Sequence, residues 1–366
     1  MNKNISVVMF SRAGNEDKAS RMTQFIIEAY HSVNQIILVV DNEFDVRKIE
    51  KYDFLSFIQS NFDSPWSKAK ATIDVLIKNN LILLTPDDDY FLYVQEDLLN
   101  FSEGGFDYAC INYAMVKKSI ITLDNEPVYE LFNAWKHHLI AANIPDVKLR
   151  IDDFVDQGVA TFWGLYSYKH FKSSMNFASY ASMLLSRNNI DLTQIIEDCE
   201  NIINLASKMY CASQSWCLRM LDRKSTNHKT WLSSAVVFQK ISIDFTETKY
   251  ELTKSLRNII NDISGLHYSD EHINDMLERH VNGYISANSR IWRDGLCIFY
   301  LPNVLNKNSI QRVMINKLDK DDVKIFIVGD LLFGSDIALK YSWVNKTGFK
   351  QLFNLTGPQA ILNHKF

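Results

Sequence analysis

Three short apolar segments near the N-terminus constrain the fold of this chain more than any other feature. They cover residues 5–10 (ISVVMF), 36–40 (IILVV) and 81–85 (LILLT), and each ends at turn-forming or acidic residues. Strands that are apolar along their whole length are typical of a parallel sheet covered by helices on both faces. The sequence therefore predicts an α/β fold with a mostly parallel central sheet and flanking helices.

The segments between and after these strands support this prediction. Residues 18–33 and 67–80 have the 3.6-residue periodicity of amphipathic helices, and residues 191–210 predict a long helix. Residues 106–116 and 215–220 predict further strands, and residues 129–144 predict a helix. From about residue 231 the pattern is largely helical, with one more strand-like run at 323–334. We place a boundary near residue 235, which gives units 1–235 and 236–366, the second mainly helical.

Composition excludes several classes of protein. The chain of 366 residues is 47% hydrophobic with a net charge of −4, so it can bury a core and lacks the basic excess of nucleic-acid-binding proteins. No apolar run approaches the ~20 residues of a membrane span, and the N-terminus does not resemble a signal peptide. Five cysteines without CxxC spacing predict free thiols, and His272 and His280 are predicted to lie at the surface. We expect a cytoplasmic protein.

Polar residues follow each of the three strands. They are Ser11 and Arg12 after the first, Asp41 after the second, and the acidic triplet 87–89 after the third. Because ligands bind outside the carboxyl ends of strands in open parallel sheets, these residues are expected to converge on one site.

The acidic triplet predicts a metal site. Adjacent carboxylates repel each other, and a divalent cation relieves this repulsion. Hard oxygen ligands suit Mg²⁺ or Mn²⁺, commonly with substrate phosphates completing the coordination shell. A solvated acidic turn that caps the next helix is the alternative interpretation.

The segment 81–91, LILLTPDDDYF, resembles the strand and DXD motif of bacterial family-2-like glycosyltransferases with the A-type (nucleotide-diphospho-sugar transferase) fold. In that family the motif binds a metal and a nucleotide diphosphate. The resemblance covers residues 5–222 and implies that Asp87 and Asp89 bind Mn²⁺ or Mg²⁺. It also implies that Asp87 and Asp88 contact the nucleotide diphosphate.

The resemblance extends to the other polar positions. It implies nucleotide contacts for Ser11 and Arg12 in the turn VVMFSRAGN, although the family's usual turn sequence is absent there. It further implies such contacts for Asp41 and for Lys68 or Lys70. Each has a simpler alternative: Asp41 could cap the following turn, and the lysines could be solvated helix residues.

The catalytic base has several candidates. The segment IIEDCENIINLASKMYCASQSWCLRM resembles the family's acidic helix followed by a strand that ends in arginine. This implies Glu197 or Asp198 as the base and Arg219 as a phosphate contact. Asp153 competes for the role of base. Alternatively, the acidic residues could form a solvated helix face and Arg219 could lie at the surface.

The resemblance implies a metal-dependent, inverting glycosyltransferase. The donor would be a nucleotide-diphosphate sugar, most simply a UDP-sugar, and the acceptor a hydroxyl of a saccharide or lipid-linked saccharide in surface polysaccharide synthesis. Such an enzyme would work in the cytoplasm or at the inner face of the membrane. Residues 1–235 would bind the donor, while residues 236–366 would shape the acceptor side or a self-association surface.

Two other functions stay open. A sugar nucleotidyltransferase could use an acidic metal site on a similar sheet, but its first strand is normally followed by a glycine-rich loop. Here that turn contains only Gly14. A non-catalytic carbohydrate-binding or scaffolding protein could keep the fold without metal-dependent nucleotide binding. A Walker NTPase is disfavoured because GxxxxGK[ST] is absent.

Overall fold

The computed structural model describes residues 4–30, 32–62, 64–87, 89–93, 95–123, 126–135, 141–155, 164–187, 193–221, 246–291, 297–300, 323–327, 339–345 and 348–355. The first half of the chain contains β1 (Ile5–Phe10), α1 (Glu16–Ala29), β2 (Val33–Val40), the 3-10 helix η1 (Val46–Lys48), β3 (Leu55–Gln59), α2 (Pro65–Ala71), β4 (Leu81–Pro86), β5 (Asp89–Leu92), α3 (Gln95–Glu103), β6 (Tyr108–Leu123), β7 (Glu126–Trp135) and α5 (Val147–Phe154).

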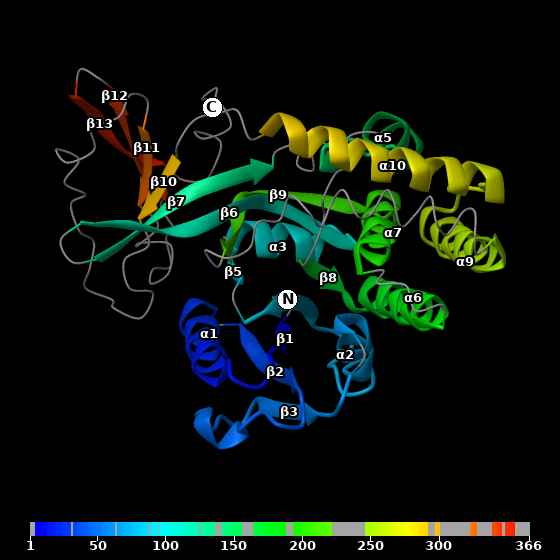
Figure 1. Ribbon diagram of the computed structural model, residues 1–366, viewed down its shortest axis with the longest axis horizontal. Coiled ribbons are helices and arrows are strands. Elements are labelled where there is room, and N and C mark those ends of the chain that lie inside the picture. Colours follow the sequence, from blue (N-terminus) through cyan, green and yellow to red (C-terminus); the bar gives the residue numbers. More distant parts are fainter. Residues whose placement is uncertain are drawn as a thin grey trace.

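The second half contains β8 (Leu165–Ser167), α6 (Tyr168–Ser186), α7 (Thr193–Ala206), β9 (Met209–Leu221), α9 (Thr246–Ser264), α10 (Asp270–Ile291), β10 (Cys297–Tyr300), β11 (Val323–Ile327), β12 (Leu339–Asn345) and β13 (Gly348–Leu355). Figure 1 shows these elements along the chain.

The central sheet has the strand order β3-β2-β1-β4-β8-β6-β9. In this part of the sheet β8 is antiparallel to its neighbours, and the remaining pairs are parallel. The structure therefore confirms the predicted α/β class with a mostly parallel sheet and flanking helices. The arrangement is compatible with the A-type fold.

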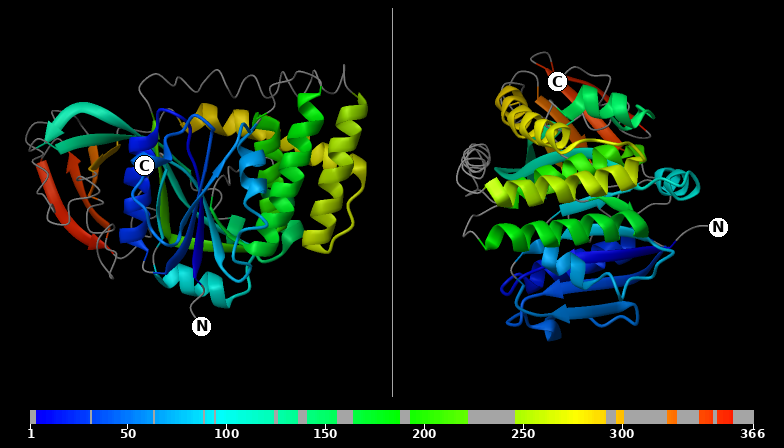
Figure 2. Two further views of the ribbon diagram at one scale, coloured as in Figure 1. Left: turned by 90° about the horizontal axis from the view of Figure 1, so that it is seen from below. Right: turned by 90° about the vertical axis from the view of Figure 1, so that its right-hand side faces the viewer.

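The three apolar strands are buried on both faces. Figure 2 shows α1 on one side of β1 and β2, with α2 on the other. Val8, Ile37 and Leu84 belong to the core cluster that also contains residues of α2, α6 and α7. Alternate residues such as Met9 and Leu38 are also fully buried. This two-sided coverage explains why the strands carry no polar alternation.

A second group of strands extends the sheet beyond β6. β7 pairs with β6 in antiparallel register, and β10 to β13 continue outward from β7. The predicted helix at residues 129–144 is therefore wrong for the part that forms β7. Its β-branched and aromatic residues, including Val128, Tyr129 and Phe132, suit a strand that has β6 as partner.

The C-terminal region combines helices and strands. The predicted helices correspond to α9 and α10, and β11 covers the first residues of the strand-like run predicted at 323–334, the rest of which lies outside the described residues. The other described C-terminal residues form β10, β12 and β13, which the helical expectation did not include. The predicted boundary near residue 235 lies outside the described residues.

Helices α6, α7, α9 and α10 pack together beside the sheet (Figure 1). Leu252, Leu256 and Ile260 of α9 are buried in the same apolar cluster as Met175 of α6 and Ile203 of α7. The helices after residue 245 thus share a core with the helices that cover the sheet. Among the described residues, no helix is long and apolar enough to cross a membrane.

Candidate functional site

The ends of β1, β2 and β4 meet at one edge of the sheet. Phe10, the last residue of β1, lies opposite Val39 of β2 and Pro86 of β4 in the parallel register. Ser11, Asp41 and Asp87 follow these strands directly, so the predicted convergence of the strand ends is confirmed.

Lys68 of α2 joins the ends of β1 and β2. Its Nζ lies 2.7 Å from Asp41 Oδ1 and donates a hydrogen bond to the backbone carbonyl of Ser11 at 3.1 Å. The Ser11 hydroxyl in turn donates to Asp87 Oδ2 at 2.6 Å. We call Ser11, Asp41, Lys68 and Asp87 the strand-end cluster.

The strand-end cluster combines buried and accessible polar groups. The residues Ser11 and Asp87 are 5% and 8% exposed, whereas the side chains of Lys68 and Asp41 are 13% and 31% exposed. One ammonium group therefore stands among two carboxylates at a partly open edge. Both ionic and hydrogen-bonding groups are available there for a polar ligand.

The sequence of α2 determines which lysine reaches the cluster. Ser64 caps the helix by accepting a hydrogen bond from the Ser67 amide, and Pro65 occupies the first turn. Trp66 and Ala69 are buried, which fixes the rotation of the helix. This rotation brings Lys68 to the strand ends and leaves Lys70 exposed. Of the two predicted lysines, the structure therefore brings Lys68 into the cluster.

The rest of the acidic triplet leads into β5. Asp89 is fully buried at the start of that strand, and its backbone carbonyl accepts a hydrogen bond from Thr85 Oγ1 at 3.1 Å. Asp88 lies outside the described residues. Arg219 of β9 is the register partner of Asp89 in the antiparallel β5–β9 pair. The topology thus brings the backbone of Arg219, the predicted phosphate contact, beside the acidic motif. Arg12, the other predicted arginine, is exposed in the turn after β1.

The predicted base candidates lie on helices and not at the strand ends. Asp198 of α7 is 1% exposed, with its Oδ1 3.3 Å from Nδ1 of the buried His280 of α10. Glu197 is half-buried on the same helix, and Asp153 is exposed on α5. The surface position predicted for His280 is therefore wrong. The alternative of a solvated acidic face on α7 is also wrong for Asp198 and Glu200, because both are buried.

Glu200 of α7 is a buried carboxyl group with no predicted role. Trp66 Nε1 donates to its Oε2, and the Tyr166 hydroxyl donates to its Oε1, both at 3.2 Å. Burial raises the pKa of Glu200 to about 7, and these two hydrogen bonds oppose that shift only in part. The sequence gives no signal for this burial, because Glu197, Asp198 and Glu200 together are typical of a solvated acidic helix face.

The acidic motif by itself offers few ligands for a divalent cation. Among the described residues, no group of three or more His, Cys, Asp or Glu side chains is arranged to hold a metal ion. Asp87 and Asp89 nevertheless supply hard oxygen donors. Mg²⁺ is commonly bound by one or two carboxylates plus the phosphates of the substrate. A metal ion at Asp87 and Asp89 therefore stays a prediction from the family resemblance.

Comparisons with known proteins leave the family open. No family model matches the sequence, and no curated protein matches it. One similar solved structure is a 4-diphosphocytidyl-2C-methyl-D-erythritol synthase from Anaerococcus prevotii, with 15% identity and a TM-score of 0.23 over 33% of this chain. This chain spans only 58% of that protein.

A second similar structure is the 2-C-methyl-D-erythritol 4-phosphate cytidylyltransferase of Francisella tularensis. It has 5% identity and a TM-score of 0.29, over 63% of this chain and 98% of that one. At such TM-scores neither likeness carries an argument about the function of this chain.

Proposed function

We propose that the protein transfers a sugar from a nucleotide-diphosphate donor to a hydroxyl acceptor, with the donor bound at the strand-end cluster. The carrying observation is the direct contact among Ser11, Asp41, Lys68 and Asp87. They meet outside the carboxyl ends of parallel strands, where open α/β sheets bind ligands. The acidic motif that resembles a glycosyltransferase DXD motif begins at the same edge.

The contacts suggest a role for each side chain. Asp41 is the most exposed carboxylate of the cluster and can accept hydrogen bonds from the ribose hydroxyls. Lys68 can place its charge beside the diphosphate when the bound nucleotide sugar replaces its contacts with Asp41 and the Ser11 carbonyl. Ser11 orients Asp87 through its hydroxyl. Asp87 and Asp89 would hold a Mn²⁺ or Mg²⁺ ion, which would supply positive charge for the diphosphate leaving group.

The acceptor side requires a general base that takes the proton of the attacking hydroxyl. Glu197, Asp198 and Asp153 stay predictions for this role. Asp198 is closed off by its contact with His280, whereas Asp153 is exposed. Inversion at the anomeric carbon also stays a prediction, because it comes from the family resemblance.

Two measurements separate this proposal from its alternatives. Titration of UDP with and without Mn²⁺ tests nucleotide binding, and a carbohydrate-binding or scaffolding protein would show no metal-dependent affinity. Incubation with UDP-sugars and saccharide acceptors then tests the reaction. Release of UDP supports sugar transfer, whereas formation of a nucleotide-sugar from a nucleoside triphosphate and a sugar phosphate, with release of pyrophosphate, would identify a nucleotidyltransferase.

A further inference from the structure

We propose that Glu200 is a positioning residue that holds α2, through Trp66, in the rotation that brings Lys68 to the strand ends. This inference rests on the proposed function only for its consequence for nucleotide binding. Its structural content concerns a contact between two elements that are 134 residues apart in the sequence. The hydrogen bond between Trp66 and Glu200 is independent of the acidic motif at residues 87–89.

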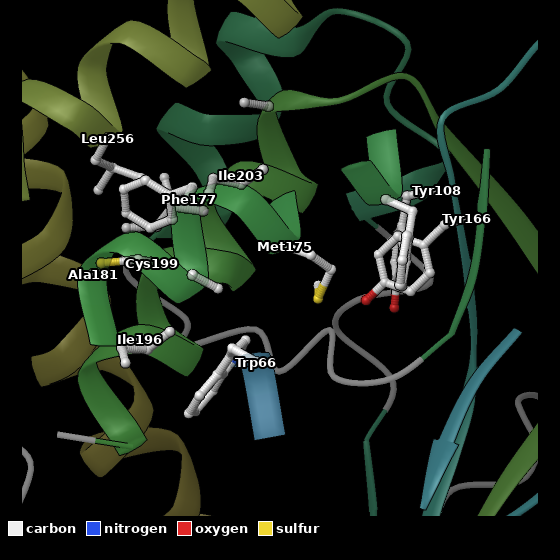
Figure 3. Close-up of a cluster of buried hydrophobic side chains, with 14 of the residues drawn as sticks. Trp66, Tyr108, Tyr166, Met175, Phe177, Ala181, Ile196, Cys199, Ile203 and Leu256 are labelled. Atoms are coloured by element: carbon white, nitrogen blue, oxygen red, sulfur yellow. The ribbon is translucent and has the colours of Figure 1, made fainter. Parts of the chain in front are cut away.

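The first step is the link between α7 and α2. Trp66 is 4% exposed and Glu200 is 7% exposed, and the indole Nε1–H donates to the carboxylate at 3.2 Å. A buried N–H group needs an acceptor, so this bond holds the Trp66 ring in one orientation. In Figure 3 the Trp66 side chain extends from α2 toward the helical layer.

The second step is the anchoring of Glu200 itself. Its other carboxylate oxygen accepts a hydrogen bond from Tyr166 of β8, and Tyr166 is fully buried. The ring of Tyr166 packs edge-to-face against Tyr108 of the central sheet, with centroids 5.0 Å apart (Figure 3). Glu200 is therefore held from the sheet side while it holds Trp66 on α2.

The third step leads from Trp66 to the cluster. Trp66 and Lys68 are two residues apart on a helix that covers only 7 residues, so a rotation of one moves the other. Because successive residues point about 100° apart on a helix, a small rotation would carry Nζ away from Asp41 and from the Ser11 carbonyl. The geometry thus makes Glu200 the remote support of Lys68, which contacts both strand ends.

The test is a double-mutant cycle between this support and Lys68. UDP affinity in the presence of Mn²⁺ is measured for the wild type, Trp66→Phe, Lys68→Ala and the double variant. We expect each single change to weaken binding roughly tenfold or more, through loss of the charge-assisted contact. Lys68→Ala should then cost less than about threefold in the Trp66→Phe background. Effects that multiply fully in the double variant would overturn the proposal.

Two further variants separate positioning from packing. Glu200→Gln keeps an acceptor oxygen for Trp66 and should retain most of the nucleotide affinity. Glu200→Leu has a similar size without an acceptor and should behave like Trp66→Phe. Equal affinities for these two variants would overturn the proposal. The matched control is Tyr210→Phe. It removes a hydroxyl that donates to Asp97 of α3 at 3.1 Å, a hydrogen bond that involves neither α2 nor α7. Lys68→Ala should keep its full effect in that background.

The same double-mutant cycle without nucleotide tests the positioning role of Glu200 independently of the proposed glycosyltransferase function. Urea unfolding of the four proteins gives the coupling between Trp66 and Lys68 without any ligand. Non-additive unfolding free energies support the positioning role even if the wild type binds no UDP. Additive unfolding free energies would overturn the role even if nucleotide binding is found.

Discussion

Asp87 and Asp89 carry the predicted metal affinity. Their joint replacement by Ala should abolish Mn²⁺-dependent UDP binding, because no oxygen donor of the pair is left for the ion. The fold should persist, but the melting temperature should fall, because the buried Ser11 hydroxyl loses its acceptor and this loss outweighs the relief of like-charge repulsion. Calorimetric titration of UDP with and without Mn²⁺ measures this effect. The control is Asp74→Ala, which removes an exposed carboxylate, and equal UDP affinity in both variants would contradict the metal assignment.

The two lysines of α2 are predicted to differ in effect. Lys68→Ala should weaken UDP binding by about 10- to 100-fold, the usual effect of losing a charge-assisted hydrogen bond. Lys70→Ala should leave the affinity within about twofold, because Lys70 is exposed on the same helix. Dissociation constants at one fixed salt concentration test the pair. A larger loss for Lys70 would show that α2 binds the donor through another face.

Glu200 should make folding stability depend on pH. Its pKa is raised from 4.5 to about 7 in the folded protein, so the folded state binds its proton more tightly than the unfolded state does. The stabilisation is therefore complete below about pH 4.5 and is lost as the pH rises through about 7, and it amounts to ~3 kcal/mol at most. Glu200→Gln should flatten this part of the pH–stability curve.

Urea unfolding of the wild type and of Glu200→Gln between pH 5 and 9 measures this difference. The comparison isolates Glu200 from its titratable neighbours. Burial lowers the pKa of His170, which gives a pH dependence of the opposite sign, and it raises the pKa of Tyr108 and Tyr166 well above this window. Parallel curves for the two proteins would show that Glu200 stays ionised throughout.

At the scale of elements, burial explains which predictions succeeded. The strand predicted at residues 5–10 has the same bounds as β1, because helices cover both of its faces and its whole length is apolar. The first part of the helix predicted at residues 129–144 forms β7 instead, because pairing with β6 decides its structure. Such pairing is a tertiary effect that helical periodicity does not report.

In the candidate site, too, some features could be predicted from the sequence and others depend on tertiary contacts. The convergence of Ser11, Asp41 and Asp87 followed from strand topology alone. The choice of Lys68 over Lys70 depends on the rotation of α2, which buried contacts of Trp66 determine. The partner of Trp66 lies on α7, far along the sequence, so no local pattern could identify it.

Strand β9 contains an irregularity that suggests a stability test. Its pairing with β6 passes from Ile111↔Ala212 to Asn112↔Trp216, so residues 213–215 have no register partner on β6. Ser215 Oγ donates to Asp97 of α3 at 2.7 Å within this segment, and both residues are buried. Ser215→Ala should cost about 1–3 kcal/mol, because a buried acceptor loses a donor. Urea unfolding measures the loss, and a change below about 0.5 kcal/mol, the level of a neutral surface substitution, would contradict it.

At the scale of the whole molecule, the helical layer makes the two parts of the chain interdependent. Leu256 and Ile260 of α9 and Met276 of α10 are fully buried in the cluster that also contains Ile196 and Phe177. Each such side chain contributes about 1.5–3 kcal/mol when it is buried. A chain that ends at residue 235 would expose the apolar faces of α6 and α7 to water.

Truncation tests this interdependence. A protein that ends at residue 235 should aggregate or lose its cooperative thermal transition, whereas one that ends at residue 291 keeps α9 and α10 and should stay folded and bind UDP. Size-exclusion chromatography, thermal unfolding and UDP titration of both proteins measure the difference. A soluble, cooperatively folding 1–235 protein would contradict the shared core and support the boundary near residue 235.

The 1–291 protein also tests the role of the residues after 291, which include β11 to β13. If it binds UDP but transfers no sugar to an acceptor that the full chain uses, those residues serve the acceptor side. Transfer at the full rate would exclude that role, because donor and acceptor would then both bind within the first 291 residues.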